Sequence, residues 1–196
     1  MRRRDILAGI GSAGVVAGAG AVAIYGLPSV DDLTGEDDGY ADDPLEIETV
    51  DAPGSEAGTV QIPDPEKITF IDIFGTWCPP CIEQMPALGE ASDRIGDGDE
   101  IQFLSVTNES IGENRAITMD ELLEWWREHD GDWTLGLDPS AELTERYLQG
   151  DYPSAVAIDT AGRVQWGDSG IKTADELVDG IEQAFEADNA VDMTGE

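Results

Sequence analysis

The fold of this chain is decided by one stretch of sequence, Ile68-Thr69-Phe70-Ile71-Asp72-Ile73-Phe74-Gly75-Thr76-Trp77-Cys78-Pro79-Pro80-Cys81. Its first half is a nearly continuous apolar run, which is typical of a strand buried on both faces of a sheet. Its second half carries two cysteines separated by two residues, and a helix is predicted from the cysteines to about residue 95. The cysteine pair is therefore expected at the N-terminus of a helix that follows a buried strand.

This position gives the two cysteines a chemical meaning. A sulfur at a helix N-terminus points toward unsatisfied backbone N–H groups, which favour the thiolate, the attacking species. The spacing lets the second sulfur close a disulfide with the first. Pro79 and Pro80 are tolerated because first-turn N–H groups have no helical partner, and they remove two donors and stiffen the ring. We expect them to tune the reduction potential of Cys78 and Cys81.

A metal site is the alternative for a cysteine pair. The chain holds only these two cysteines and one histidine, His129. Half of a zinc site would therefore lack its second ligand pair. His129 lies near the predicted end of a helix, where a surface histidine is favoured electrostatically. Redox chemistry is the better interpretation of the pair, with no metal and no cofactor.

Further along the chain, strands and helices alternate. Two capping boxes, Thr118-x-x-Glu121 and Thr173-x-x-Glu176, predict helix starts. Trp125 and Trp126 follow the first box on one helix side, and with Trp133 they are interpreted as packing residues. The other predicted elements are strands at 101–106 and 133–137, a helix at 139–148, and a hairpin of strands 155–158 and 164–166. Such an order indicates an α/β fold with a sheet of mixed direction.

The stretch from Phe70 to Cys81, continued by Met85-Pro86-Ala87-Leu88, resembles the thioredoxin superfamily. It is most similar to the TlpA-like, membrane-tethered branch, which includes the thioredoxins of cytochrome c maturation. Pro86 falls where the family kinks its active-site helix, and residues 118–130 match the helical insertion of this branch. The resemblance implies a thioredoxin-like fold, a central mixed β-sheet flanked by helices, with the TlpA-type insertion.

The resemblance also implies roles for residues outside the cysteine pair. Asp151-Tyr152-Pro153-Ser154 precedes a strand as the family's cis-proline loop does, so Pro153 is expected to be cis and packed against both sulfurs. Trp77 would shield the disulfide and form part of the contact surface. Two departures concern substrate choice: Tyr152 replaces a small or β-branched residue whose backbone meets the incoming peptide, and Gln84 replaces a common glutamate.

Asp72 interrupts the apolar run, where a buried charge would be costly. It lies six residues before Cys78, which is the offset of the buried acid that exchanges protons with the second cysteine in true thioredoxins. Burial would raise its pKa into a useful range. The alternative is a strand residue that faces solvent or caps a neighbour.

The implied reaction is dithiol–disulfide exchange, in which Cys78 forms a mixed disulfide with the substrate and Cys81 resolves it. The implied partners are exported cysteine-containing proteins and a membrane electron donor or acceptor that recharges the pair. The resemblance favours a reductant, for example in cytochrome c maturation. A disulfide-forming oxidase is one alternative. A copper chaperone of the same fold is another, but it requires a differently spaced pair and a late-loop histidine.

The N-terminal residues 1–27 are predicted to be a twin-arginine-type signal or a membrane anchor. Arg3-Arg4-Asp5-Ile6-Leu7 has the twin-arginine pattern, and an uncharged stretch runs from residue 6 to 27. Ala21-Val22-Ala23 resembles a cleavage site, whereas the apolar residues after it favour a retained anchor. In both cases the remainder of the chain is expected outside the cytoplasm.

Residues 28–57 are predicted to be an acidic flexible linker, because carboxylates recur from residue 31 to 56 without a basic residue. A surface loop ending in an edge strand at 45–50 is the alternative. The thioredoxin-like domain is then expected at 58–188, followed by a frayed tail at 189–196.

The chain carries 43 acidic and 10 basic residues, a net charge of −33. The acidic residues continue through segments with helical periodicity, so an acidic tail on an ordinary domain does not explain them. Molar salt shortens the Debye length to about 3 Å and removes most of the repulsion. We therefore expect a halophilic source. The charge argues against nucleic acid as a partner.

Overall fold

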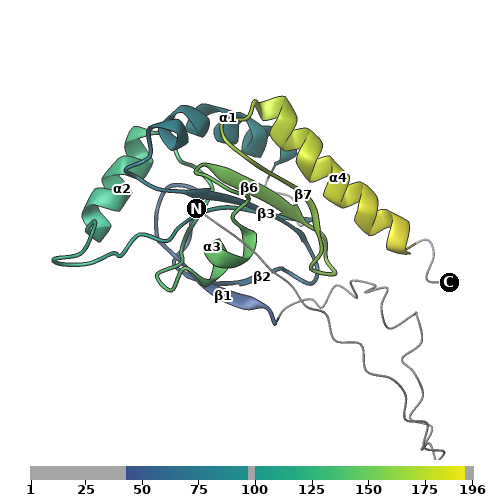
Figure 1. Cartoon of the computed structure of the whole chain (residues 1–196), viewed down its shortest axis with the longest axis horizontal. Coiled ribbons are helices and arrows are strands. Elements are labelled where there is room, and N and C mark those ends of the chain that lie inside the picture. Colours follow the sequence, from purple (N-terminus) through teal and green to yellow (C-terminus); the bar gives the residue numbers. More distant parts are fainter. Residues whose placement is uncertain (1–42, 97–99, 193–196) are drawn as a thin grey trace, which may run out of the picture. The chain divides into compact units, whose positions relative to one another are not determined.

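The computed structural model describes residues 43–96 and 100–192, which form a seven-stranded sheet with helices on both faces (Figure 1). The strands are β1 (Leu45–Thr49), β2 (Gly58–Ile62), β3 (Ile68–Phe74), β4 (Ile101–Thr107), β5 (Thr134–Leu137), β6 (Ser154–Ile158) and β7 (Val164–Ser169). The helices are α1 (Pro79–Ile95), α2 (Met119–Glu128), α3 (Glu142–Tyr147) and α4 (Ala174–Asp192).

The sheet is mixed, as predicted, with the order β2-β1-β5-β4-β3-β6-β7. β3 pairs in parallel with β4 and antiparallel with β6, and every residue of β3 is buried. This burial explains why the strand reads as an apolar run without alternation. Because β3 lies inside the sheet, the residues that follow it are held between neighbouring strand ends.

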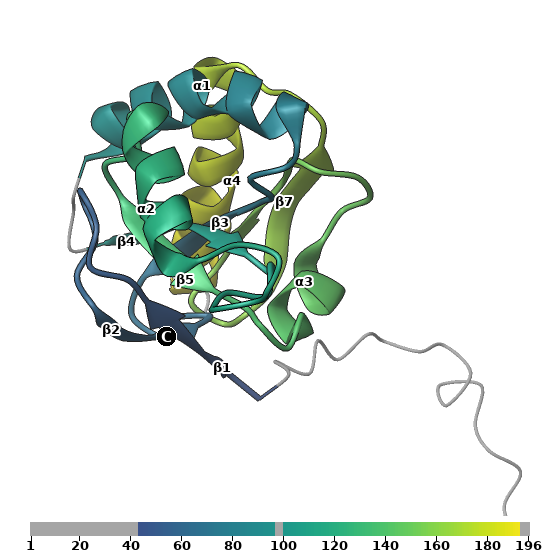
Figure 2. The same cartoon turned by 90° about the vertical axis from the view of Figure 1, so that its left-hand side faces the viewer.

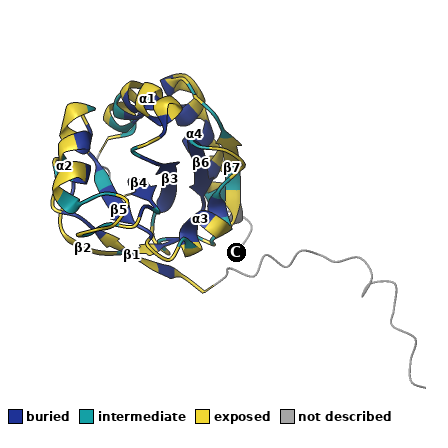
Figure 3. Cartoon of the chain, turned by 60° about the vertical axis from the view of Figure 1, so that its left-hand side comes forward, coloured by how far each residue is buried: buried dark blue, intermediate teal, exposed yellow. Residues whose placement is uncertain are grey.

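The two faces of the sheet are covered differently (Figure 2). Helices α1, α2 and α4 pack on one face, where their side chains share a core with Phe70 and Phe74 of β3. Helix α3 packs on the other face, where Leu143 joins Ile71 and Ile73 of β3. Figure 3 shows the buried strands between exposed outer helix surfaces. Alternate residues of β3 therefore face different helices.

The predicted helix starts are confirmed by their hydrogen bonds. Thr118 accepts a bond from the backbone N–H of Glu121 at 3.3 Å, and the Glu121 carboxylate accepts one from the N–H of Thr118 at 2.8 Å. Thr173 and Glu176 repeat the arrangement before α4. Each box satisfies donors that the first helical turn leaves without partners.

The predicted start of the domain at Gly58 is too late. The alternative of a strand at 45–50 is confirmed in part, because residues 45–49 form β1, but this strand lies inside the sheet between β2 and β5 and not at its edge. Its glutamates Glu46 and Glu48 are exposed, while Leu45 and Ile47 are buried. The acidic residues that suggested a linker are thus the outward half of an alternating strand. At the other end, α4 continues to Asp192, past the predicted start of the tail at 189.

The predicted signal or anchor at 1–27, the linker residues 28–42 and the last four residues lie outside the described part of the chain. Within the described ranges, no helix has the length and apolarity that crossing a membrane requires.

Candidate active site

The cysteine pair lies at the C-terminal end of β3, where four strand ends meet. The registers pair Phe74 of β3 with Thr107 of β4, and Thr107 with Leu137 of β5. Strand β6 runs antiparallel to β3, so its first residue, Ser154, pairs with Ile73. The loops after β3, β4 and β5 and the loop before β6 therefore share one edge of the sheet.

Cys78 is the N-cap residue of α1, with Pro79 and Pro80 in the first turn as predicted. The two sulfurs are joined in a disulfide, and the backbone N–H of Cys81 donates to Cys78 Sγ at 3.2 Å. Both cysteines are almost fully buried, with exposed fractions of 2% and 1%. A helix N-terminus directed at Cys78 Sγ favours its thiolate once the disulfide is reduced.

Trp77 is the exposed side chain beside the buried disulfide, at 64% exposure. Its ring meets that of Tyr152 edge to face, with centroids 5.4 Å apart. A Cβ at Gly75 would lie 2.7 Å from the Trp77 ring, so glycine leaves room for this position of the ring. Trp77 and Tyr152 thus form one aromatic surface over the entrance to the cysteines.

The loop before β6 carries the cis proline that the resemblance implies. The Tyr152–Pro153 peptide bond is cis, and Pro153 leads directly into β6 beside β3. Burial raises the pKa of the Tyr152 hydroxyl above its usual value, and the neighbouring Asn108 and Thr144 side chains oppose this rise. Thr144 in turn donates to the buried Asp138 carboxylate at 2.8 Å. The Tyr152 ring thus contacts Trp77, while its hydroxyl lies near Asn108 and Thr144.

Asp72 is buried, with 1% of its surface exposed, so the solvent-facing alternative is wrong. It alternates with Phe70 and Phe74, whose side chains share a core cluster with Cys78 and Cys81. The Asp72 carboxyl therefore faces the layer that carries the cysteines. Burial raises its pKa to about 7, opposed by a hydrogen bond that Ser105 donates at 2.9 Å. An acid of this pKa can both take and release a proton near neutral pH.

The sequence offered no signal for Glu109, which anchors the cysteine loop. This carboxylate is 8% exposed and accepts bonds from the Thr76 backbone N–H at 2.7 Å and the Thr76 hydroxyl at 3.0 Å. Thr107 adds a third bond at 3.3 Å. Thr76 and Glu109 are 33 residues apart and meet only because β3 and β4 end together.

Gln84, the noted departure from the family pattern, has a structural contact. Its side chain is 2% exposed and forms two hydrogen bonds with the backbone of Lys172. The Lys172 N–H donates to Gln84 Oε1 at 2.6 Å, and Gln84 Nε2 donates to the Lys172 carbonyl at 3.1 Å. A glutamate could accept the first bond but could not donate the second. Gln84 therefore joins α1 to the loop that precedes α4.

The tryptophans of the second helical region are buried, as predicted. Trp125, Trp126 and Trp133 all belong to the core over the cysteine-bearing face. His129 is the C-cap residue of α2, and its ring contacts Trp125 edge to face at 4.7 Å. Packing is not the whole role of Trp133, because its indole N–H donates to Ser105 Oγ at 2.9 Å. Among the described residues, no cluster of three or more His, Cys, Asp or Glu side chains could hold a metal ion.

Comparison with known families now identifies the class of protein. The sequence profile of the family described as Redoxin matches residues 47–184. The chain belongs to the Redoxin family. The match begins at Ile47 in β1, which agrees with the inclusion of this strand in the fold.

Curated relatives of this Redoxin-family chain carry names of one activity. The thiol-disulfide oxidoreductase ResA of Bacillus cereus is 25% identical over 112 residues, which cover 57% of this chain and 60% of the relative. The sporulation thiol-disulfide oxidoreductase A of Bacillus subtilis is 21% identical over 128 residues, which cover 65% of this chain and 74% of the relative. The chain thus spans about 60% of the length of its ResA relatives.

Solved structures confirm the fold of this Redoxin-family chain. The crystal structure of StoA from Bacillus subtilis superposes with a TM-score of 0.57 at 18% identity, covering 69% of this chain and 94% of that one. The exposed lipoprotein thioredoxin of Streptococcus pneumoniae gives 0.57 at 22% identity, covering 71% and 98%. The fold is thioredoxin-like, and it carries the cysteine pair that a thiol–disulfide oxidoreductase requires.

Proposed function

We propose that this chain is an extracytoplasmic thiol–disulfide oxidoreductase that exchanges its Cys78–Cys81 dithiol or disulfide with exported proteins. The observation that carries the proposal is the Cys78–Cys81 disulfide at the start of α1, on the sheet face toward which the buried Asp72 points. The aromatic surface of Trp77 and Tyr152 beside it provides a contact region for a protein substrate. The names of the curated relatives support the same activity.

In the reducing direction, the Cys78 thiolate attacks one sulfur of a substrate disulfide, and the other substrate sulfur leaves as a thiolate. A Cys78–substrate mixed disulfide results. The Cys81 thiol then gives its proton to Asp72 and attacks Cys78 Sγ, which releases the second substrate thiolate. Two electrons pass to the substrate, and the chain is left with its internal disulfide. No cofactor takes part in this exchange.

We propose the reducing direction, with a membrane donor that returns electrons to the Cys78–Cys81 disulfide. Exported proteins with cysteines, including apo-cytochromes awaiting haem, are the proposed substrates. The support for this direction is the sequence resemblance to the membrane-tethered branch, while the names of the ResA relatives support the exchange activity alone. The exposed lipoprotein thioredoxin among the structural neighbours supports a location outside the cytoplasm. The N-terminal residues 1–27 would direct the domain there.

Equilibration of the Cys78–Cys81 pair with defined glutathione buffers tests the direction of electron flow. A reductant should have a potential near that of thioredoxin, about −270 mV, whereas strong disulfide-forming oxidases lie near −120 mV. A value near the second figure would contradict the reducing role and support the oxidase alternative. A pair that exchanges with neither glutathione nor a protein disulfide would contradict the activity itself.

A further inference from the structure

A chain of two buried hydrogen bonds leads to Asp72 through the neighbouring strand β4. The Trp133 indole N–H donates to Ser105 Oγ at 2.9 Å, and Ser105 Oγ donates to Asp72 Oδ2 at 2.9 Å. The exposed fractions are 5% for Trp133, 0% for Ser105 and 1% for Asp72. These bonds are shielded from competing water, so each hydrogen bond is electrostatically stronger than the same bond would be in water.

The direction of the two bonds is determined by chemistry. An indole N–H can only donate, so Ser105 Oγ must accept from Trp133. The single hydroxyl proton of Ser105 is then left for the Asp72 carboxyl, which accepts it best when ionised. Trp133 thereby fixes the orientation in which Ser105 stabilises the charged form of Asp72.

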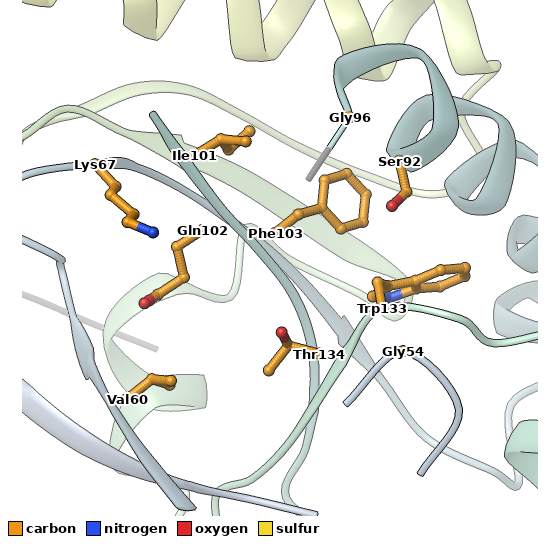
Figure 4. A pocket seen from close by; sticks show the side chains of 10 residues that line it. All are labelled: Gly54, Val60, Lys67, Ser92, Gly96, Ile101, Gln102, Phe103, Trp133 and Thr134. Carbon is orange, nitrogen blue, oxygen red and sulfur yellow. The ribbon is translucent and has the colours of Figure 1, made fainter. Parts of the chain in front are cut away.

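The fold holds each member of this chain in place. Asp72 and Ser105 are directly paired in the register of β3 and β4, and Trp133 immediately precedes β5, the next strand. The Trp133 ring contacts Phe103 and Trp126 edge to face, at 5.9 and 5.0 Å. With Phe103 it forms one wall of a hollow of about 380 Å³ that lies apart from the cysteine pair (Figure 4).

Among the described residues, no charged side chain contributes to the pKa shift of Asp72, whose causes are burial and the hydrogen bond from Ser105. In the core cluster on this face, α2 and α4 contribute apolar side chains, and β6 contributes Ala155 and Ala157. Helix α1 contributes Cys78 and Cys81, and Tyr152 packs against the cluster from the loop before β6. The neighbouring Gln84 is neutral and bonded to the Lys172 backbone. Within the described residues, Ser105 is the side chain that hydrogen-bonds to Asp72.

We infer that Ser105 and Trp133 are positioning residues, which hold the Asp72 carboxylate ready to take the proton of Cys81 during the resolving step. The inference rests on the proposed role of Asp72 as the base in that step. The proton moves from Cys81 Sγ to Asp72, while Ser105 keeps its own proton. Trp133 acts only through Ser105, and neither residue touches the reacting sulfurs in this role.

Two measurements on the full chain test the inference. Carbon NMR follows the titration of the Asp72 carboxyl directly. Stopped-flow mixing of the reduced protein with excess of an aromatic disulfide, whose released thiolate absorbs visible light, resolves two phases. The first phase reports attack by Cys78, and the second reports release of the second aromatic thiolate by Cys81. Recording the second phase against pH gives the profile of the resolving step.

Ser105→Ala should move the Asp72 titration to higher pH by about one unit, because the charged form loses a hydrogen bond. The pH profile of the second phase should move with it, so that resolution at pH ~6.5 becomes slower by up to about tenfold. Trp133→Phe, which keeps an aromatic ring, should shift both in the same direction by a smaller amount. If Ser105→Ala does not fold, the same two measurements on Trp133→Phe provide the test.

Trp125→Phe is the matched control, because Trp125 is also a buried tryptophan but its ring contacts those of Phe74 and His129 and not that of Trp133. It should leave the Asp72 titration and the second phase unchanged. If the Asp72 titration does not move in Ser105→Ala or in Trp133→Phe, the inference is overturned, while the proposed role of Asp72 as base still stands. A titration that moves while the second phase keeps its profile would overturn the role of Asp72 as base, and the inference with it.

Discussion

Asp72 shows how one side chain can be both costly for stability and useful for chemistry. Its carboxyl is buried in the core that contains the cysteines, with Ser105 as its hydrogen-bond donor. Burial disfavours the charged form and raises the pKa to about 7. The same desolvation that destabilises the fold gives the acid a pKa suited to proton exchange with Cys81.

Asp72→Asn should therefore slow the resolving step but not the first attack. Asparagine keeps the size and polarity of the side chain but cannot accept the Cys81 proton. Mixed-disulfide decay in stopped flow should be slower by about tenfold or more at pH ~7, and the deficit should shrink toward pH ~9, where Cys81 ionises unaided. Equal decay rates for the variant and the parent at pH ~6.5 would leave Asp72 with a structural role only.

The same substitution should stabilise the fold in a pH-dependent manner. Between the ordinary pKa of 3.8 and the folded value of about 7, the unfolded chain releases the Asp72 proton while the folded chain keeps it. The free energy of unfolding of the parent should thus fall as pH rises from about 4 to about 7 and then level off. Urea denaturation should show Asp72→Asn more stabilising at pH ~8 than at pH ~4, by at most on the order of 4 kcal/mol. A pH-independent difference would contradict the raised pKa.

Glu109 should stabilise the conformation of the loop that carries the cysteines. In Glu109→Gln an amide can no longer accept every bond that the carboxylate receives from Thr76 and Thr107. We expect a loss of about 1–3 kcal/mol in stability and a slower first attack by Cys78. Glu113→Gln is the control, because Glu113 lies exposed on the same connection after β4. Equal thermal stabilities of the two variants would show that the hydrogen bonds of Glu109 do not stabilise the cysteine loop.

At the scale of single residues, the sequence predicted those residues whose role depends on nearby positions in the chain. The spacing of Cys78 and Cys81 and the offset of Asp72 lie within one short segment. Ser105 and Glu109 were not predicted, because each finds its partner across the pairing of β3 with β4. An ordinary serine or glutamate in a sequence does not reveal which strand will lie beside it.

At the scale of elements, apolar runs and capping boxes located most strands and helices correctly. The exceptions were β2, for which no strand was predicted, and β1, for which a strand was only the alternative to a linker. The β1 segment LEIET carries glutamates at both exposed positions. Composition favoured a linker there, while the alternation of buried and exposed residues reflects pairing with β2 and β5. The predicted helix at 139–148 is shorter in the structure, where α3 spans Glu142–Tyr147. Such boundaries depend on tertiary contacts that a local pattern does not contain.

Truncation tests the membership of β1 in the fold. A chain that begins at residue 43 should unfold cooperatively, because it retains Leu45 and Ile47 in the core. A chain that begins at Gly58 should lack the partner of β2 and β5 and should not fold. Circular dichroism with urea denaturation compares the two. Cooperative unfolding of the shorter chain at similar stability would show that β1 is dispensable.

For the whole molecule, charge is the dominant feature. Carboxylates occupy outward positions of the folded elements, as on β1, and are not confined to the N-terminal segment. With 43 acidic and 10 basic residues, ion pairing can neutralise only a minority of them. Arg94, which lies between Glu90 and Asp175, shows how exposed such pairs are. Mutual repulsion should thus weaken the fold at low salt.

Salt should therefore stabilise this protein and accelerate its reaction. Between ~0.1 M and ~1 M potassium chloride the Debye length falls from about 10 Å to about 3 Å, which screens exposed carboxylates but leaves short contacts largely intact. The melting temperature and the rate of attack by Cys78 should both rise over this range. A melting temperature and a rate that stay constant would contradict the expected adaptation to high salt.

Trapping of mixed disulfides tests the central claim, that Cys78 exchanges with exported proteins and Cys81 resolves the product. Cys78 is the N-cap residue of α1, whereas Cys81 lies one turn further into the helix, and both are almost fully buried. In cells, Cys81→Ser should accumulate disulfide-linked complexes with exported proteins on non-reducing gels, while Cys78→Ser should accumulate few. Equal trapping by the two variants, or none by either, would contradict this account.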